Sequence, residues 1–171
     1  VNESVSVHIG AAGDVTAQAG FYNIDLTVSA DPLWSRDYSG FGFCGEDRPS
    51  PTQGQVQDTY FLYEITSPYT SAVWLMEEYL PTTTDSHTAA SLQIAIWESV
   101  MDDPDSSGYH IEDGEGAFHV NDTSWNKDLA QSYLDALFAA DLSSFDTAAY
   151  RLVSDDGYGS GGQQDFVVKN T

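Results

Sequence analysis

Hydrophobic and polar residues alternate along several short stretches near both ends of the chain. A period of two places successive side chains on opposite faces of an extended strand, so these stretches predict half-buried β-strands. Residues 1–30 are predicted to be strands, with clear alternation at 5–9 and 22–28, and further strands are predicted at 41–44, 59–65, 150–153 and 166–168. A glycine- and aspartate-rich segment, 155–162, predicts a hairpin-like loop before the last strand.

The middle of the chain changes to the three-to-four-residue period of helices. The predicted helices cover residues 72–80, 88–101 and 124–140. Ser67 and Pro68 suit the start of the first helix, and Pro81 ends it. Asp85 or Ser86 is the expected cap of the second. Apolar residues run nearly all the way round this second helix, which predicts that it is buried.

Together these elements predict an α+β fold in a single domain. The chain has 171 residues, which suits one domain. Strands at about 1–65 and 148–171 would form a β-rich sandwich-like or barrel-like part, and a helical insertion would span about 68–140.

The charge of the chain limits its partners. Five Lys and Arg stand against 27 Asp and Glu, giving a formal net charge of −22. Such a surface repels nucleic-acid phosphates and anionic lipids and attracts cationic groups, although the same charge also serves solubility alone. No apolar run reaches the length of a membrane span, so membrane insertion is not expected. No signal peptide is visible, as in a mature protein.

Cys44 is the only cysteine, so it cannot form an internal disulfide. An inert buried thiol, a metal or redox ligand, an intermolecular bridge and a nucleophile all remain open for it. Gln93 lies in the middle of the most apolar predicted helix. A buried carboxamide costs roughly 1–3 kcal/mol unless its donors and acceptor are paired. Attack of a Cys44 thiolate on the Gln93 carbonyl would expel ammonia and leave a thioester, which removes both amide donors.

A thioester must be kept away from water, because water competes with the intended nucleophile. Phe43 and Trp97 flank the two reactants in sequence and would shield the bond. Gly45 allows a close backbone approach and could offer an N–H group to the acyl oxygen. The site residues expected from this reading are Cys44 and Gln93 as the bonded pair, with Phe43, Gly45 and Trp97 around them.

Two short motifs contain the cysteine and the glutamine: residues 41–44 read Phe-Gly-Phe-Cys, and residues 92–97 read Leu-Gln-Ile-Ala-Ile-Trp. Together they resemble the thioester domains of bacterial surface adhesins. Those domains carry an aromatic-X-Cys motif followed, after a variable stretch, by an apolar-Gln-X-Ala-Ile-Trp motif. Residues 72–80 also look like the helix that precedes the glutamine motif, and the similarity covers roughly 40–155.

The resemblance implies a thioester-domain-like fold in which Cys44 and Gln93 are bonded. It implies a module that captures an amine, such as a lysine of a target protein, in one covalent event and is therefore not a turnover enzyme. The implied location is extracellular, on the bacterial cell surface, as a monomeric module of a larger multidomain protein. No cofactor is implied.

Two alternative functions remain open at this stage. The acidic stretch 102–108 resembles the opening of an EF-hand loop, but Gly114 stands where the bidentate glutamate belongs. A solvated acidic loop is the simpler reading, and a non-covalent, calcium-stabilised extracellular binding module is the first alternative. A Cys-dependent hydrolase or transamidase, pairing Cys44 with His110 or His119, is the second.

Overall fold

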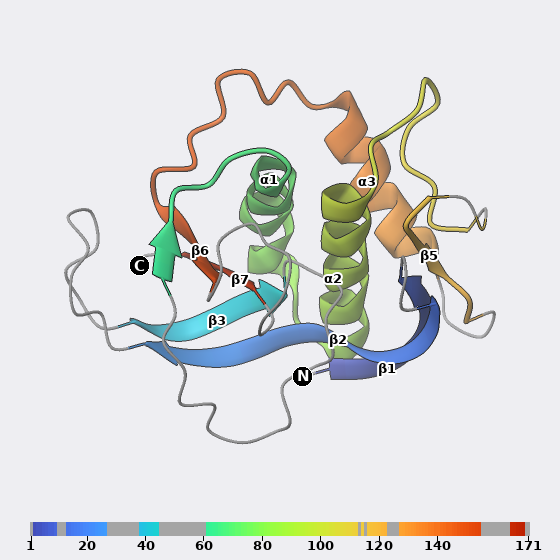
Figure 1. Cartoon of the computed structure of the whole chain (residues 1–171), viewed down its shortest axis with the longest axis horizontal. Coiled ribbons are helices and arrows are strands. Elements are labelled where there is room, and N and C mark those ends of the chain that lie inside the picture. Colours follow the sequence, from blue (N-terminus) through green and yellow to red (C-terminus); the bar gives the residue numbers. More distant parts are fainter. Residues whose placement is uncertain are drawn as a thin grey trace.

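The computed structural model describes residues 2–9, 13–26, 38–44, 61–112, 114, 116–122, 127–154 and 165–169. Its strands are β1 (Asn2–Ile9), β2 (Gly13–Leu26), β3 (Tyr38–Cys44), β4 (Phe61–Tyr63), β5 (Phe118–Val120), β6 (Tyr150–Ser154) and β7 (Phe166–Lys169). Its helices are α1 (Tyr69–Tyr79), α2 (Ser86–Met101) and α3 (Asp128–Ala139), with a 3₁₀ turn, η2 (Leu80–Thr82), between the first two. Figure 1 shows their arrangement.

The strands form one antiparallel sheet in the order β4-β6-β7-β3-β2-β1-β5. The predicted α+β class is therefore confirmed. The sheet is open between its edge strands β4 and β5 in the described part of the chain. The sandwich-like or barrel-like arrangement predicted from the sequence is not found there. Alternation within a strand predicts which face is buried, but it does not say whether a sheet closes.

Strand β2 joins two halves of the sheet. Its residues 13–20 pair with β1, and its residues 21–26 pair with β3. Gly20 lies where β2 changes partner, and its φ is +147°. Residues other than glycine rarely adopt this backbone conformation. A single long strand therefore carries β1 and β5 on one half and β3, β7, β6 and β4 on the other.

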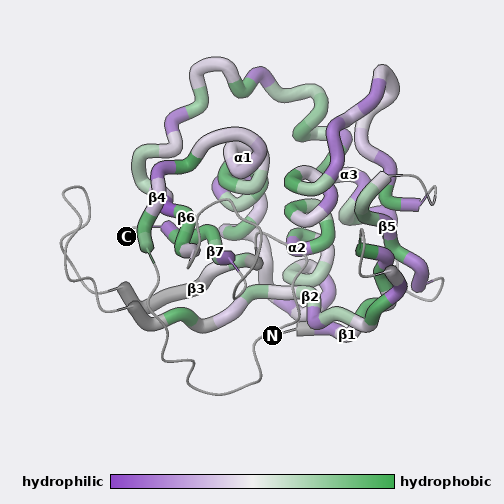
Figure 2. Tube along the Cα trace, in the orientation of Figure 1, coloured by the Kyte–Doolittle hydropathy of each residue, from purple (hydrophilic) through white to green (hydrophobic). Residues whose placement is uncertain are grey.

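Helix α2 is the centre of the core. It packs against α1, α3 and four strands, β1, β2, β3 and β5 (Figure 1). Every residue from 89 to 99 is buried, as the sequence predicted for a helix that is apolar on all sides. Figure 2 shows hydrophobic residues along much of α2 and on parts of β2 and β5. Helices and strands thus share one hydrophobic core.

The predicted helices are confirmed within a few residues at each end. The α2 prediction was the most accurate, because its cap is specified locally. Asp85 accepts a hydrogen bond from the Thr88 N–H at 2.8 Å, and the Thr88 hydroxyl accepts one from the Asp85 N–H at 3.2 Å. One strand was missed. The β5 residues lie inside the predicted helical insertion and pair with β1.

Removing the α2 cap should lower stability. Asp85→Ala leaves the Thr88 N–H without its acceptor, and we expect a loss of about 1 kcal/mol in the free energy of unfolding. Urea titration followed by circular dichroism measures it. Asp103→Ala is the matched control, because it removes one exposed carboxylate in the loop after α2. Equal losses in the two variants would contradict a role for the capping box.

Candidate functional site

Gln93 lies where the sequence predicted it, in the middle of α2 and fully buried. None of its surface is exposed to solvent. Its neighbours Leu92 and Ile94 are likewise inaccessible. A polar carboxamide thus lies between fully buried apolar residues of the core. This placement makes Gln93 the residue around which a candidate site is built.

Cys44 is the last residue of β3, next to the helical layer. The backbone pairs Phe43 with Val167 and Cys44 with Phe166 of β7. The Cα atoms of α2 and β3 approach within 8 Å, and the arrowhead of β3 points toward α2 in Figure 1. The element that ends at Cys44 and the helix that carries Gln93 are therefore neighbours. The Cys44 side chain and Gly45 lie outside the described part of the structure.

The strand leading to Cys44 is packed tightly. Phe43 is fully buried in the main core, where its ring meets Phe21 edge-on at a centroid distance of 6.2 Å. A side chain at Gly42 would collide with the Ile24 Cδ1 and come within 3.1 Å of the Val167 carbonyl oxygen. Gly42 therefore lets β2 and β7 close around β3, and the main chain entering Cys44 is held on both sides.

Trp97 is also buried, with 3% of its surface exposed. It follows Gln93 by one helical turn and contacts the Phe118 ring of β5, with the two centroids 5.9 Å apart. Residues four apart share one face of a helix, so Trp97 lies on the face of α2 that carries Gln93. The described residues thus place Phe43 and Trp97 in the same core as Gln93.

A buried carboxyl group on α2 was not singled out from the sequence. Glu98 is 3% exposed, and burial raises its pKa from 4.5 to about 7. Its Oε1 accepts a hydrogen bond from the His110 N–H at 3.1 Å, which opposes the shift only in part. Oε2 has no hydrogen-bond partner among the described residues. The sequence could have indicated the burial of this carboxyl group, because Glu98 stands in a helix that is apolar on nearly all sides.

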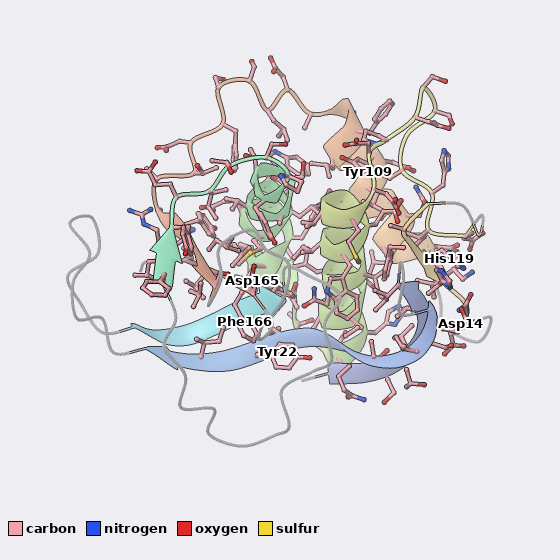
Figure 3. All side chains as sticks on the ribbon, in the orientation of Figure 1. Asp14, Tyr22, Tyr109, His119, Asp165 and Phe166 are labelled. Atoms are coloured by element: carbon pink, nitrogen blue, oxygen red, sulfur yellow. The ribbon has the colours of Figure 1, made fainter. Side chains whose placement is uncertain are left out.

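A second buried carboxyl group lies beside the strand pair that contains Cys44. Asp165 directly precedes β7 and has no exposed surface, whereas its neighbour Phe166 pairs with Cys44. Phe166 packs edge-on against Tyr22 at a centroid distance of 6.0 Å. Figure 3 shows these three labelled side chains around the end of β3. The predicted loop at 155–162 lies outside the described residues, and the position of Asp165 after this glycine-rich segment gave no sequence signal for burial.

The acidic loop after α2 uses its carboxylates to bind its own main chain. Asp102 accepts hydrogen bonds from the N–H groups of Ala117 and Phe118, at 2.7 and 2.8 Å, and so anchors the start of β5. Asp105 accepts from the Ser107 side chain and backbone, which lowers its pKa to about 2. These contacts match the solvated-loop reading. No three His, Cys, Asp or Glu side chains within the described ranges are grouped to hold a metal ion.

The histidines considered for a Cys–His enzyme lie on other elements. His110 is in the acidic loop, where its Nε2 lies 2.9 Å from the Ser107 hydroxyl. His119 is on β5, stacked on His8 with ring centroids 4.6 Å apart. Strand β5 is three positions from β3 in the sheet, which corresponds to about 14 Å or more at ordinary strand spacing. The backbone therefore does not bring His119 beside Cys44.

His8 and His119 instead form a polar row across three strands. His8 lies opposite both Asp14 of β2 and His119 of β5. Its Nδ1 is 2.8 Å from the Asp14 Oδ1, and that oxygen also accepts a hydrogen bond from Asn121 at 2.9 Å. These two hydrogen bonds lower the pKa of Asp14. Figure 3 shows Asp14 and His119 at the β5 end of the sheet, away from Asp165 and Phe166.

The described helices and the comparisons add two findings. In the part of the chain that the structure covers, no helix combines the length and apolar character that a bilayer crossing requires. No protein-family model, curated protein or solved structure matches the chain. The resemblance to adhesin thioester domains therefore rests on the two motifs and on the chemistry of their residues.

Proposed function

We propose that this chain is a surface adhesion module that captures amines through an internal Cys44–Gln93 thioester. The proposal includes a thioester-domain-like fold, a place on the bacterial cell surface within a larger protein, and a single covalent event per molecule. Its target would be an amine-bearing surface, such as the lysines of another protein.

One observation carries the proposal most directly. Gln93 is fully buried on α2, and α2 lies against β3, the strand that ends at Cys44. A Cys–Gln thioester joins the two Cα atoms through six bonds and reaches roughly 7–8 Å when extended. Cα atoms of the two elements approach within 8 Å. The helix and the strand thus lie side by side, which a bond of this length between them requires.

The chemistry also accounts for a glutamine at this position. Attack of the Cys44 sulfur on the Gln93 Cδ forms the C–S bond, and ammonia leaves with the thiol proton. The product has a carbonyl oxygen but no amide N–H, so less polar surface must be satisfied in the core. An incoming amine later attacks the same carbon, forms an amide with Gln93 and displaces the Cys44 thiolate, which takes up the proton lost by the amine.

The few amines of the described residues are already in ion pairs. The Lys169 Nζ lies 2.7 Å from Glu77, and the Lys127 Nζ lies 3.6 Å from Glu112. These are the only two lysines of the chain. The net charge of −22 attracts cationic groups from outside. Both features favour capture of an external amine over an internal one.

Intact mass of the native protein tests the proposal. We expect the wild-type mass to be lower than the sequence mass by one ammonia, and the Cys44→Ala variant to have its full sequence mass. Denaturing the wild-type protein in neutral buffer with ample time for hydrolysis should add one water to the lowered mass. A wild-type mass equal to the sequence mass, together with free alkylation of Cys44 in the native state, would refute the thioester.

A further inference from the structure

Trp97 holds a buried hydrogen-bond donor with no acceptor in the described part of the chain. Its indole Nε1 is inaccessible, and no oxygen or nitrogen of the described residues lies in position to accept from it. An unsatisfied buried donor typically costs about 1–3 kcal/mol, and such groups are uncommon in native cores. A phenylalanine here would fill much of the same space without this cost. The N–H group therefore calls for an explanation beyond packing.

The helix brings this donor close to Gln93. Residues four apart on a helix lie one above the other, with Cβ atoms about 5–6 Å apart. Long side chains on a helix lean toward its N-terminus, so an indole at 97 leans over the position of Gln93. Both residues are buried in the core. The Phe118 ring packs against Trp97 at a tilt of 55° and limits the space into which the indole can turn.

We propose that the Trp97 N–H donates a hydrogen bond to the acyl oxygen of Gln93 as that oxygen gains charge. This inference rests on the proposed thioester. When an amine attacks the Gln93 carbonyl carbon, the C=O electron pair moves to oxygen and an oxyanion forms. The C–S bond then breaks, the carbonyl is restored, and the Cys44 thiolate accepts the proton released by the amine. The same oxyanion forms when the thiol first attacks the carboxamide.

Trp97 suits the stabilisation of the oxyanion because its N–H has no acceptor among the described residues. A donor with no acceptor in the resting core has no hydrogen bond to break when the oxyanion appears. A preorganised donor in a dry environment stabilises such a charge more strongly than water does. Trp97 would thus be a catalytic residue of the capture reaction as well as a shield.

The test compares the rate of methylamine addition in the wild type and in Trp97→Phe. The variant keeps an aromatic shield but lacks the N–H, and we expect aminolysis to slow by about 100-fold. Trp74→Phe is the matched control, since Trp74 lies on α1 and packs edge-on against Tyr79. Its aminolysis rate should stay at the wild-type value.

The outcomes separate this inference from the thioester itself. A wild-type protein without the ammonia deficit refutes the thioester and, with it, this role of Trp97. A Trp97→Phe protein that has the deficit and reacts at the wild-type rate overturns the role of Trp97 alone. If Trp97→Phe does not fold, β-(3-benzothienyl)alanine at position 97 replaces the N–H by sulfur with nearly the same shape. That protein should show the same slowing, and an unchanged rate would overturn the inference.

Discussion

Native protein incubated with methylamine is expected to gain one methylamide at Gln93 and to release one thiol at Cys44. The two changes should appear together and in equal amounts, because one bond is broken to form the other. Peptide mass spectrometry locates the methylamide, and iodoacetamide counts the thiol over time. Labelling should stop at one equivalent, because the acyl group is consumed.

Two variants make this result specific. Cys44→Ala retains the Gln93 carboxamide but has no leaving group, so methylamine should add nothing. Gln93→Leu replaces a buried amide by an apolar side chain of similar size in an apolar helix. This variant should therefore fold, and its Cys44 should be a free thiol before methylamine is added. Methylamine uptake by either variant, or thiol release without methylamide formation, would contradict the mechanism.

Stability is expected to fall as the pH rises from 4.5 to about 7, through the ionisation of Glu98. Burial raises the pKa of Glu98 from 4.5 to about 7, so the folded state favours the neutral acid. The stability contributed by this group is complete below pH 4.5 and is lost as the pH rises through 7. The shift corresponds to about 3 kcal/mol. Urea titrations at pH 5 and pH 8.5 measure the change.

Glu98→Gln isolates this contribution. The amide keeps an oxygen for the His110 N–H but cannot ionise, so the variant should lose less stability than the wild type between the two pH values. At pH 8.5 it should be the more stable protein. At pH 5 it should be slightly less stable, because its NH₂ group replaces an oxygen that has no partner among the described residues. Glu78→Gln, on an exposed position of α1, is the matched control.

If Glu98→Gln and Glu78→Gln lost the same amount of stability between pH 5 and pH 8.5, the role of Glu98 would be contradicted. Three other carboxylates with shifted pKa values do not affect the comparison between pH 5 and pH 8.5. Asp14, Asp85 and Asp105 have pKa values lowered from 3.8 by hydrogen bonds. The stability that they contribute is lost only as the pH falls below their ordinary range, outside the interval between pH 5 and pH 8.5.

The helices could be predicted from the sequence because their signals are local. The α2 sequence gives both its cap at Asp85 and its burial, and the burial of Gln93 follows from the same apolar pattern. The strands at both ends were also recognisable from alternation, as at Val5 and Val7. The part of the site that depends on one helix was thus within reach of sequence reasoning.

What depends on contacts between distant segments was not predicted. Residues 1–30 were predicted to be strands, but the continuous course of β2 was not, because Ala17 and Ala19 on its apolar face give a weak alternating pattern. Strand β5 has three residues, and its start is held by Asp102, sixteen positions away from Phe118. The burial of Asp165 likewise depends on packing between elements, which no local pattern specifies.

The pairing of β3 with β7 has a consequence for the order of events during synthesis. The strand that ends at Cys44 receives this neighbour only when residues 166–168 have left the ribosome, long after Gln93 has emerged. Until then the segment before Cys44 lacks one of the two strands that hold it in place. A reactive bond between these positions would thus be formed late, in a completed domain, and a nascent chain would not expose it to the amines of the cell that makes it.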